Sequence, residues 1–88
     1  MYVGDWSAQI GDLVIYETLL GTKSGMVLKV IHSDEDLKGT SLDGVSVQLP
    51  GEQKAYFITS AEGEPDFVAG IPLRVISRVQ EHHDFNEN

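Results

Sequence analysis

The chain has no cysteine and few basic side chains, and each shortage excludes a class of protein. Without cysteine there is neither a disulfide framework nor a thiolate metal site. Six lysines and arginines stand against fourteen aspartates and glutamates, so the formal net charge is −8. A nucleic-acid-binding surface needs basic side chains, because they release counterions from the phosphates. Direct nucleic-acid binding is therefore disfavoured.

Long apolar runs are also missing. No run approaches the roughly 20 residues that cross a bilayer. The opening "MYVGDWSAQIGD" lacks the basic and apolar segments of a signal peptide. We therefore expect no membrane contact and a cytoplasmic location. At 88 residues with 41% hydrophobic content, the chain suits one modest core. We expect a single domain over residues 1–80 and a flexible acidic tail over residues 81–88.

What the chain does contain is a series of short β-strand patterns. Five segments combine β-branched or aromatic residues with alternating hydrophobicity and end at turn residues. They are residues 12–17, 25–32, 45–49, 54–59 and 73–79. Residues 32–44 and 60–70 are polar or rich in glycine and are expected to be loops. This pattern predicts an all-β barrel or sandwich.

Several of these strands are apolar on both faces, so the outside of a small barrel would need a cover. One source of that cover is the N-terminal arm, through Tyr2 and Trp6. Another is the second long loop, through Phe67. The alternative is that the apolar outer face pairs with another protein.

The segment "IGDLVIYETLLGTKSGMVLKV", residues 10–30, resembles the first hairpin of SH3-like barrels of the KOW and Tudor type. The residues that fit this pattern are Gly11, Asp12, Gly25, Val27 and Val30. The ending "GIPLRVISRV", residues 70–79, is similar to the turn and last strand that close such barrels. The resemblance implies a five-stranded SH3-like barrel with a short 3₁₀ turn before the last strand. Such barrels host unrelated functions, so it implies a fold rather than an activity.

Two loop motifs resemble ligand sites and lack the full pattern. In "GTKSG", residues 21–25, Lys23 precedes the last glycine and a strand follows, so we expect a hairpin turn rather than a phosphate loop. "DEDLKG", residues 34–39, begins like a calcium loop. Its fifth position is Lys38 and its twelfth is Val45, where oxygen ligands are required. An exposed acidic loop is the better interpretation.

Metal and catalytic signatures are equally incomplete. His82 and His83 are adjacent, so on an extended chain they point in opposite directions, and no third ligand stands at a suitable spacing. No serine has the sequence context of a nucleophile. We therefore expect no metal, no cofactor and no enzymatic activity.

We expect instead a small acidic accessory module that binds another protein. Its contact surface would be the outer face of the first and fourth predicted strands together with the two long loops. The anchors would be exposed aromatic side chains, which dominate interface energies: Tyr16, Tyr56 and Phe57. Acidic loop residues would steer a basic partner: Asp34, Glu35, Asp36, Glu62, Glu64 and Asp66.

Two other functions stay open. One is an acidic nucleic-acid mimic that occupies the groove of a nucleic-acid-binding target and inhibits it. The other is a KOW-like barrel associated with RNA or the ribosome.

Overall fold

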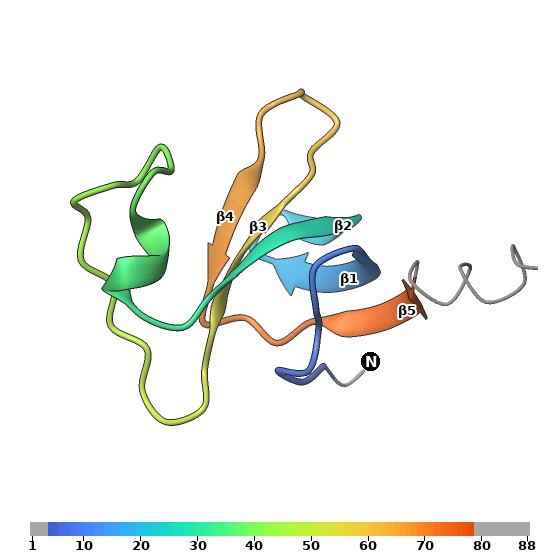
Figure 1. The fold of residues 1–88 in the computed structure, drawn as a ribbon. Coiled ribbons are helices and arrows are strands. Elements are labelled where there is room, and N and C mark those ends of the chain that lie inside the picture. Colours follow the sequence, from blue (N-terminus) through green and yellow to red (C-terminus); the bar gives the residue numbers. More distant parts are fainter. Residues whose placement is uncertain (1–3, 79–88) are drawn as a thin grey trace, which may run out of the picture.

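The computed structural model describes residues 4–78, which form five antiparallel strands and one 3₁₀ turn. The strands are β1 (Asp12–Thr18), β2 (Gly21–Ile31), β3 (Ala55–Ile58), β4 (Asp66–Ala69) and β5 (Arg74–Arg78). They make one sheet in the order β4-β3-β2-β1-β5 (Figure 1). The predicted all-β class is confirmed. Within the described residues β4 and β5 do not pair, so the sheet is not closed.

The long strand β2 belongs to both halves of the sheet. Residues 21–26 pair with β1, and residues 27–31 pair with β3. The β2–β3 register shifts between Val27 and Lys29, and such an irregularity bends a strand. We therefore distinguish a β1 half, made of β5, β1 and residues 21–26, from a β3 half, made of residues 27–31, β3 and β4.

At the bend, Gly25 lets β2 approach the end of β3 closely. A Cβ atom at this position would collide with the backbone oxygen of Thr59 and with the side chain of Ile58. Thr59 also holds the contact in place, because its hydroxyl oxygen accepts the Met26 N–H at 2.9 Å. Glycine is required here for close approach and not for an unusual backbone angle.

The inner face of the bent sheet carries the main core. Val14 and Tyr16 of β1 meet Tyr56 and Ile58 of β3 there, and all four are buried. Trp6 of the N-terminal arm packs against the same cluster. Burial at positions 12, 14 and 16 follows the two-residue period of a strand. Both halves of the sheet therefore share one inner core.

The outer face of the β3 half is covered by residues 32–54, which we call the covering segment (Figure 1). It begins with the 3₁₀ turn η1 (Asp34–Leu37), whose Leu37 is fully buried. Leu37 packs with Ile31 and Phe57 in a second hydrophobic cluster. The side chains that pack around this cluster are Leu42, Val47, Leu49 and Phe67. As a result, every residue of β3 is buried.

Four of the five predicted strands are present, and the fifth strand of the sheet is formed by residues other than those predicted. Residues 45–49 are not a strand; Val47 and Leu49 alternate because one side of this extended chain packs on the outer cluster. β4 instead forms at Asp66–Ala69, within a segment predicted to be a loop. The sequence predicts a loop here because Pro65, Gly63 and Gly70 surround this short strand, and proline and glycine are typical of loops.

The predicted turns are also displaced. The 3₁₀ turn is η1 and does not precede the last strand; residues 71–73 have no helical turn. "GTKSG" lies within β2, and the hairpin turn is formed by Leu19 and Leu20. The proposed acidic tail over residues 81–88 and the boundary at residue 80 lie outside the described residues.

Candidate functional site

The three aromatic side chains predicted to be exposed are buried instead. Tyr16 and Tyr56 point into the inner core, and Phe57 lies beneath the covering segment with only 8% of its surface exposed. Tyr16 occupies an inward position in the alternation of β1, and β3 is covered on both faces. The prediction of exposed anchors at these positions is wrong.

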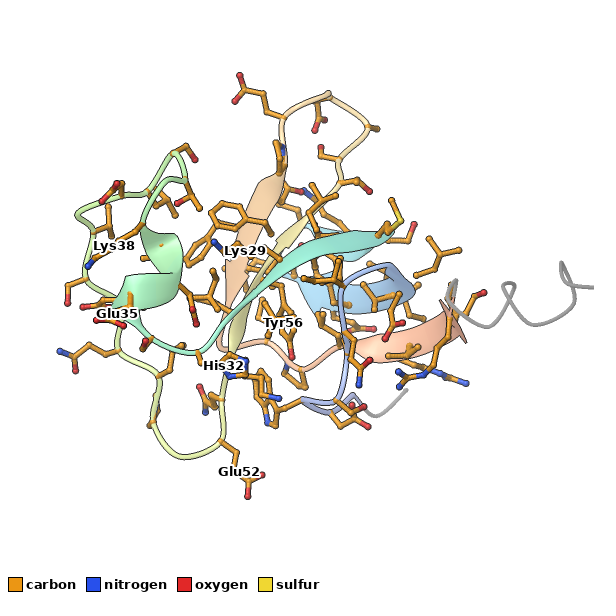
Figure 2. All side chains as sticks on the ribbon, in the orientation of Figure 1. Lys29, His32, Glu35, Lys38, Glu52 and Tyr56 are labelled. Carbon is orange, nitrogen blue, oxygen red and sulfur yellow. The ribbon has the colours of Figure 1, made fainter. Side chains whose placement is uncertain are left out.

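Both tyrosines are neutral core residues. Burial raises the pKa of Tyr56 to about 12, and the nearby Asp5 carboxylate adds to the effect. The Tyr56 hydroxyl has no hydrogen-bond partner among residues 4–78, and Figure 2 shows this residue in the middle of the molecule. Burial likewise raises the pKa of Tyr16, with a contribution from Asp66.

Two acidic residues of η1 hold the covering segment in place. Asp34 accepts hydrogen bonds from the Val47 N–H at 2.8 Å and from the Ser46 hydroxyl at 3.1 Å. Asp36 accepts the His32 N–H at 2.8 Å, and this bond is the main cause that lowers the pKa of Asp36. These two predicted steering carboxylates therefore make structural hydrogen bonds.

Of the remaining predicted acidic residues, three are exposed and Asp66 is half-buried. The Ser60 hydroxyl donates to Glu62 at 2.7 Å, and this bond lowers the pKa of Glu62. Asp66, in β4, lies 3.7 Å from the Lys23 ammonium group of β2. Glu35 and Glu64 are exposed. The structure thus places the two acidic groups in separate regions, one on η1 and one at the β3–β4 loop (Figure 1).

Asp12 links the first strand to the last. Its carboxylate is fully buried, accepts the Gln9 N–H at 2.8 Å and lies 3.2 Å from the Arg78 guanidinium. Arg78 belongs to β5, so the ion pair fastens the last strand to the first. The position that the SH3-like resemblance emphasises at the start of β1 therefore has a structural role in this chain.

An apolar surface lies on the outer face of the β1 half and extends to Leu28, at the bend of β2. Leu13 and Met26 are cross-strand partners on β1 and β2, and Leu28 follows on the same side because Val27 points into the inner core. Ile76 lies at the irregularity of β5 beside Leu13. We call this surface the bare face; its members are Ile10, Leu13, Ile15, Met26, Leu28 and Ile76.

The most exposed members of the bare face are aliphatic. The exposed fraction is 39% for Leu13, 40% for Leu28, 54% for Ile76 and 63% for Ile10. Single exposed apolar residues are ordinary, whereas a group on adjacent strands is typical of interaction sites. The bare face is therefore the candidate binding surface.

The sequence held a signal for this face. Strands that are apolar on both sides predicted either a cover or a protein partner. The predicted cover is confirmed for Phe67, which packs around the outer cluster from β4, and is wrong for Trp6, which packs on the inner core. Residues 32–54 supply the rest of the cover of the β3 half. Tyr2 lies outside the described residues. On the bare face, no segment within residues 4–78 buries Leu13, Leu28 or Ile76.

A wide hollow of about 750 Å³ lies between the N-terminal arm and residues 49–54. Trp6, His32 and Glu52 line it, and Figure 2 shows the last two. The Lys54 ammonium group donates to the Trp6 carbonyl at 2.7 Å, so its charge fastens the arm. The Ser7 hydroxyl, also in the lining, donates to the Asp5 carboxylate at 2.7 Å. The polar side chains of Asp5, Ser7 and Lys54 therefore serve local structure.

Metal-ligating groups do not gather in the part of the chain that the structure describes. No three histidine or acidic side chains between residues 4 and 78 lie close enough to hold an ion. His82 and His83 are outside this range. In the same range no helix has the length and apolar character needed to cross a membrane.

Comparisons with protein-family models, with curated proteins and with solved structures find no match to this chain. The bare face is accordingly the feature from which a function can be argued, since an exposed aliphatic surface costs free energy in water unless something covers it.

Proposed function

We propose that this chain is a non-enzymatic module that binds another protein through its bare face. The observation that supports this proposal is the exposure of Leu13, Leu28 and Ile76 on neighbouring strands. Burial of apolar surface stabilises a complex by about 25 cal/mol per Å². These side chains would supply the apolar centre of the contact.

The charges around the bare face indicate a mainly apolar partner surface. Arg74 is exposed opposite Ile15, and Glu17 lies two residues further along the same face of β1, so the charge at this end is balanced. Asp34 and Asp36 are engaged within the covering segment. Apolar contact, rather than acidic steering of a basic partner, therefore dominates the proposed interface.

The architecture that we propose is an SH3-like barrel of the KOW and Tudor type in a cytoplasmic accessory protein. The return of β5 to pair with β1, after the meander from β1 to β4, supports this proposal. The gap between β4 and β5 makes the barrel an open one.

A matched set of variants tests the bare face. The double variant Leu13→Ser, Ile76→Ser removes two apolar side chains, and Val45→Ser is the control because Val45 is 45% exposed in the covering segment. Chemical crosslinking in host lysate, read by mass spectrometry, should give one protein partner for wild type and control. The double variant should lose it while keeping a wild-type circular dichroism spectrum. Equal capture by the double variant, or none by wild type, would refute the proposal.

A further inference from the structure

The two edges of the sheet differ in how they end. Just before β5, the N-terminal arm pairs with the chain at this edge: Asp5 and Leu73 exchange two backbone hydrogen bonds of 2.9 and 3.0 Å. β5 is also irregular where it pairs with β1, and bulged or covered edges resist further strand pairing. β4 is the last strand at the other end, and within the described residues only β3 pairs with it.

The unpaired backbone groups of β4 can be identified from its register. The Gly70 N–H donates to the Lys54 carbonyl at 3.2 Å, so this pair is a hydrogen-bonded one. Hydrogen-bonded and non-hydrogen-bonded pairs alternate in an antiparallel ladder. Val68 and Asp66 therefore bond to β3, whereas the N–H and C=O groups of Phe67 and Ala69 point away from it.

A groove of about 470 Å³ opens along this edge. One wall is β4 itself, and the other is the end of the first hairpin, with Tyr16 and Thr18 of β1 and Lys23 of β2. Val68 and Ile71 add apolar surface to the lining. The groove thus combines free backbone groups with apolar contacts, which is the requirement for binding an extended peptide.

The groove is acidic at the end where β4 begins. Asp66 lines it, and Glu62 and Glu64 lie just before it in the β3–β4 loop. Lys23 is 3.7 Å from Asp66 with both side chains partly exposed, so this ion pair is weak. A segment that runs antiparallel to β4 would bring its C-terminal end to this acidic cluster.

We propose that the β4 edge binds an extended segment of a partner protein, which adds as a sixth, antiparallel strand and carries lysine or arginine at its C-terminal end. The site is separate from the bare face and does not depend on it. A second copy of this chain is a poor occupant, because two molecules of net charge −8 repel each other.

The first test uses a synthetic octapeptide that alternates threonine and valine and ends in two arginines. In a heteronuclear NMR titration of the full chain, the amide signals of Phe67 and Ala69 should shift and gain protection from hydrogen exchange. Signals of Leu13 and Ile76 on the bare face should stay in place. Replacing the two arginines by glutamine should weaken binding about threefold, as expected for exposed charge pairs.

Backbone pairing is tested by the variant Ala69→Pro, with Ala69→Ser as its control. Proline removes the outward N–H of residue 69 and leaves the β3 ladder intact, whereas serine keeps this N–H. Proline should weaken octapeptide binding about tenfold or more, the equivalent of one lost hydrogen bond, and serine should not. Methylation of alternate peptide nitrogens gives the same test without changing the protein: only one of two neighbouring sites should abolish binding.

Three results would overturn the proposal. One is an octapeptide titration that shifts the bare-face signals in place of those of β4, or shifts none. Another is equal sensitivity to methylation at both neighbouring peptide nitrogens. The third is dimerisation of the full chain in sedimentation, blocked by Ala69→Pro, which would assign the edge to a second copy. None of these results refutes the proposed role of the bare face, which is tested separately with the variants of Leu13 and Ile76.

Discussion

The outer faces of the two halves of the sheet carry similar apolar side chains, but one face is covered by other residues and the other is exposed. On the β3 half, Ile31 and Phe57 lie beneath Leu37 of the covering segment. On the β1 half, Leu13 and Ile76 face solvent. The difference lies in the connections. Residues 32–54 join β2 to β3 and are long enough to fold back over the sheet, whereas only Leu19 and Leu20 join β1 to β2.

This contrast shows that the alternation of apolar residues indicates which faces of a strand can be buried. It does not indicate which segment will cover them. A sheet face is buried when the chain has spare length nearby to fold over it. The β3 half has such a segment, and the β1 half, within the described residues, does not. A protein partner would give the bare face the cover that the covering segment gives its neighbour.

The largest expected effect comes from truncating the cover. Leu37→Ala removes a fully buried side chain beneath η1 and should lower the free energy of unfolding by about 3 kcal/mol. Ile76→Ala on the bare face should change it by less than about 0.5 kcal/mol. Urea unfolding followed by circular dichroism measures both. Similar losses for the two variants would remove the distinction between a covered and a bare face.

Alkaline pH tests whether the two halves share one core. The pKa of Tyr56 is raised from 10.0 to about 12, so its neutral form is the one that the fold favours. Its contribution to stability is complete below pH 10 and is lost as the pH rises through about 12, up to about 3 kcal/mol. Urea unfolding between pH 9 and pH 12 should show this decline, and Tyr56→Phe should reduce it.

The shared core also predicts which strands lose stability together when Tyr56 ionises. Because Tyr56 contacts the cluster that includes Val14 of β1, hydrogen exchange at high pH should accelerate in β1 and β3 together. Acceleration in β3 without β1 would mean that the halves are independent.

The smallest effect concerns the hydrogen bonds that fasten the cover. Asp34→Ala leaves the Val47 N–H and the Ser46 hydroxyl without their acceptor and should cost about 1 kcal/mol. Glu35→Ala is the matched control, since it removes the same charge from an exposed neighbour in η1. Hydrogen exchange at residues 45–49 should accelerate only in the Asp34 variant. Equal acceleration in both would mean that charge, and not the hydrogen bonds, holds the segment.

The sequence predicts the local elements well where a strand is long and regular. The sequence predicts β1 and the second part of β2 because their apolar residues persist over many positions. The first four residues of β2 are polar or glycine, and the sequence predicts them as a turn. The sequence does not predict β4, because four residues between Pro65 and Gly70 are too few to show a period. Residues 45–49 alternate as a strand does, yet they pack as irregular chain, because one-sided burial has the same period whether or not a neighbour is hydrogen-bonded.

The candidate site was harder to predict than the fold. Strands that are apolar on both faces correctly indicated that part of the outside would need a cover or a partner. Which half would be left bare depended on where residues 32–54 come to lie, and no local pattern carries that information. The prediction of the aromatic anchors is wrong for two reasons: position 16 faces inward in the alternation of β1, and position 57 is covered by residues 32–54.

The course of β2 through both halves has a consequence for how the molecule divides. A single proteolytic cut between residues 39 and 46 would separate a piece with β1 and β2 from a piece with β3, β4 and β5. Two strand pairings would still hold these pieces together: β2 with β3, and β1 with β5. Because two ladders join the pieces, we expect the two fragments to associate again into a cleaved but native-like fold.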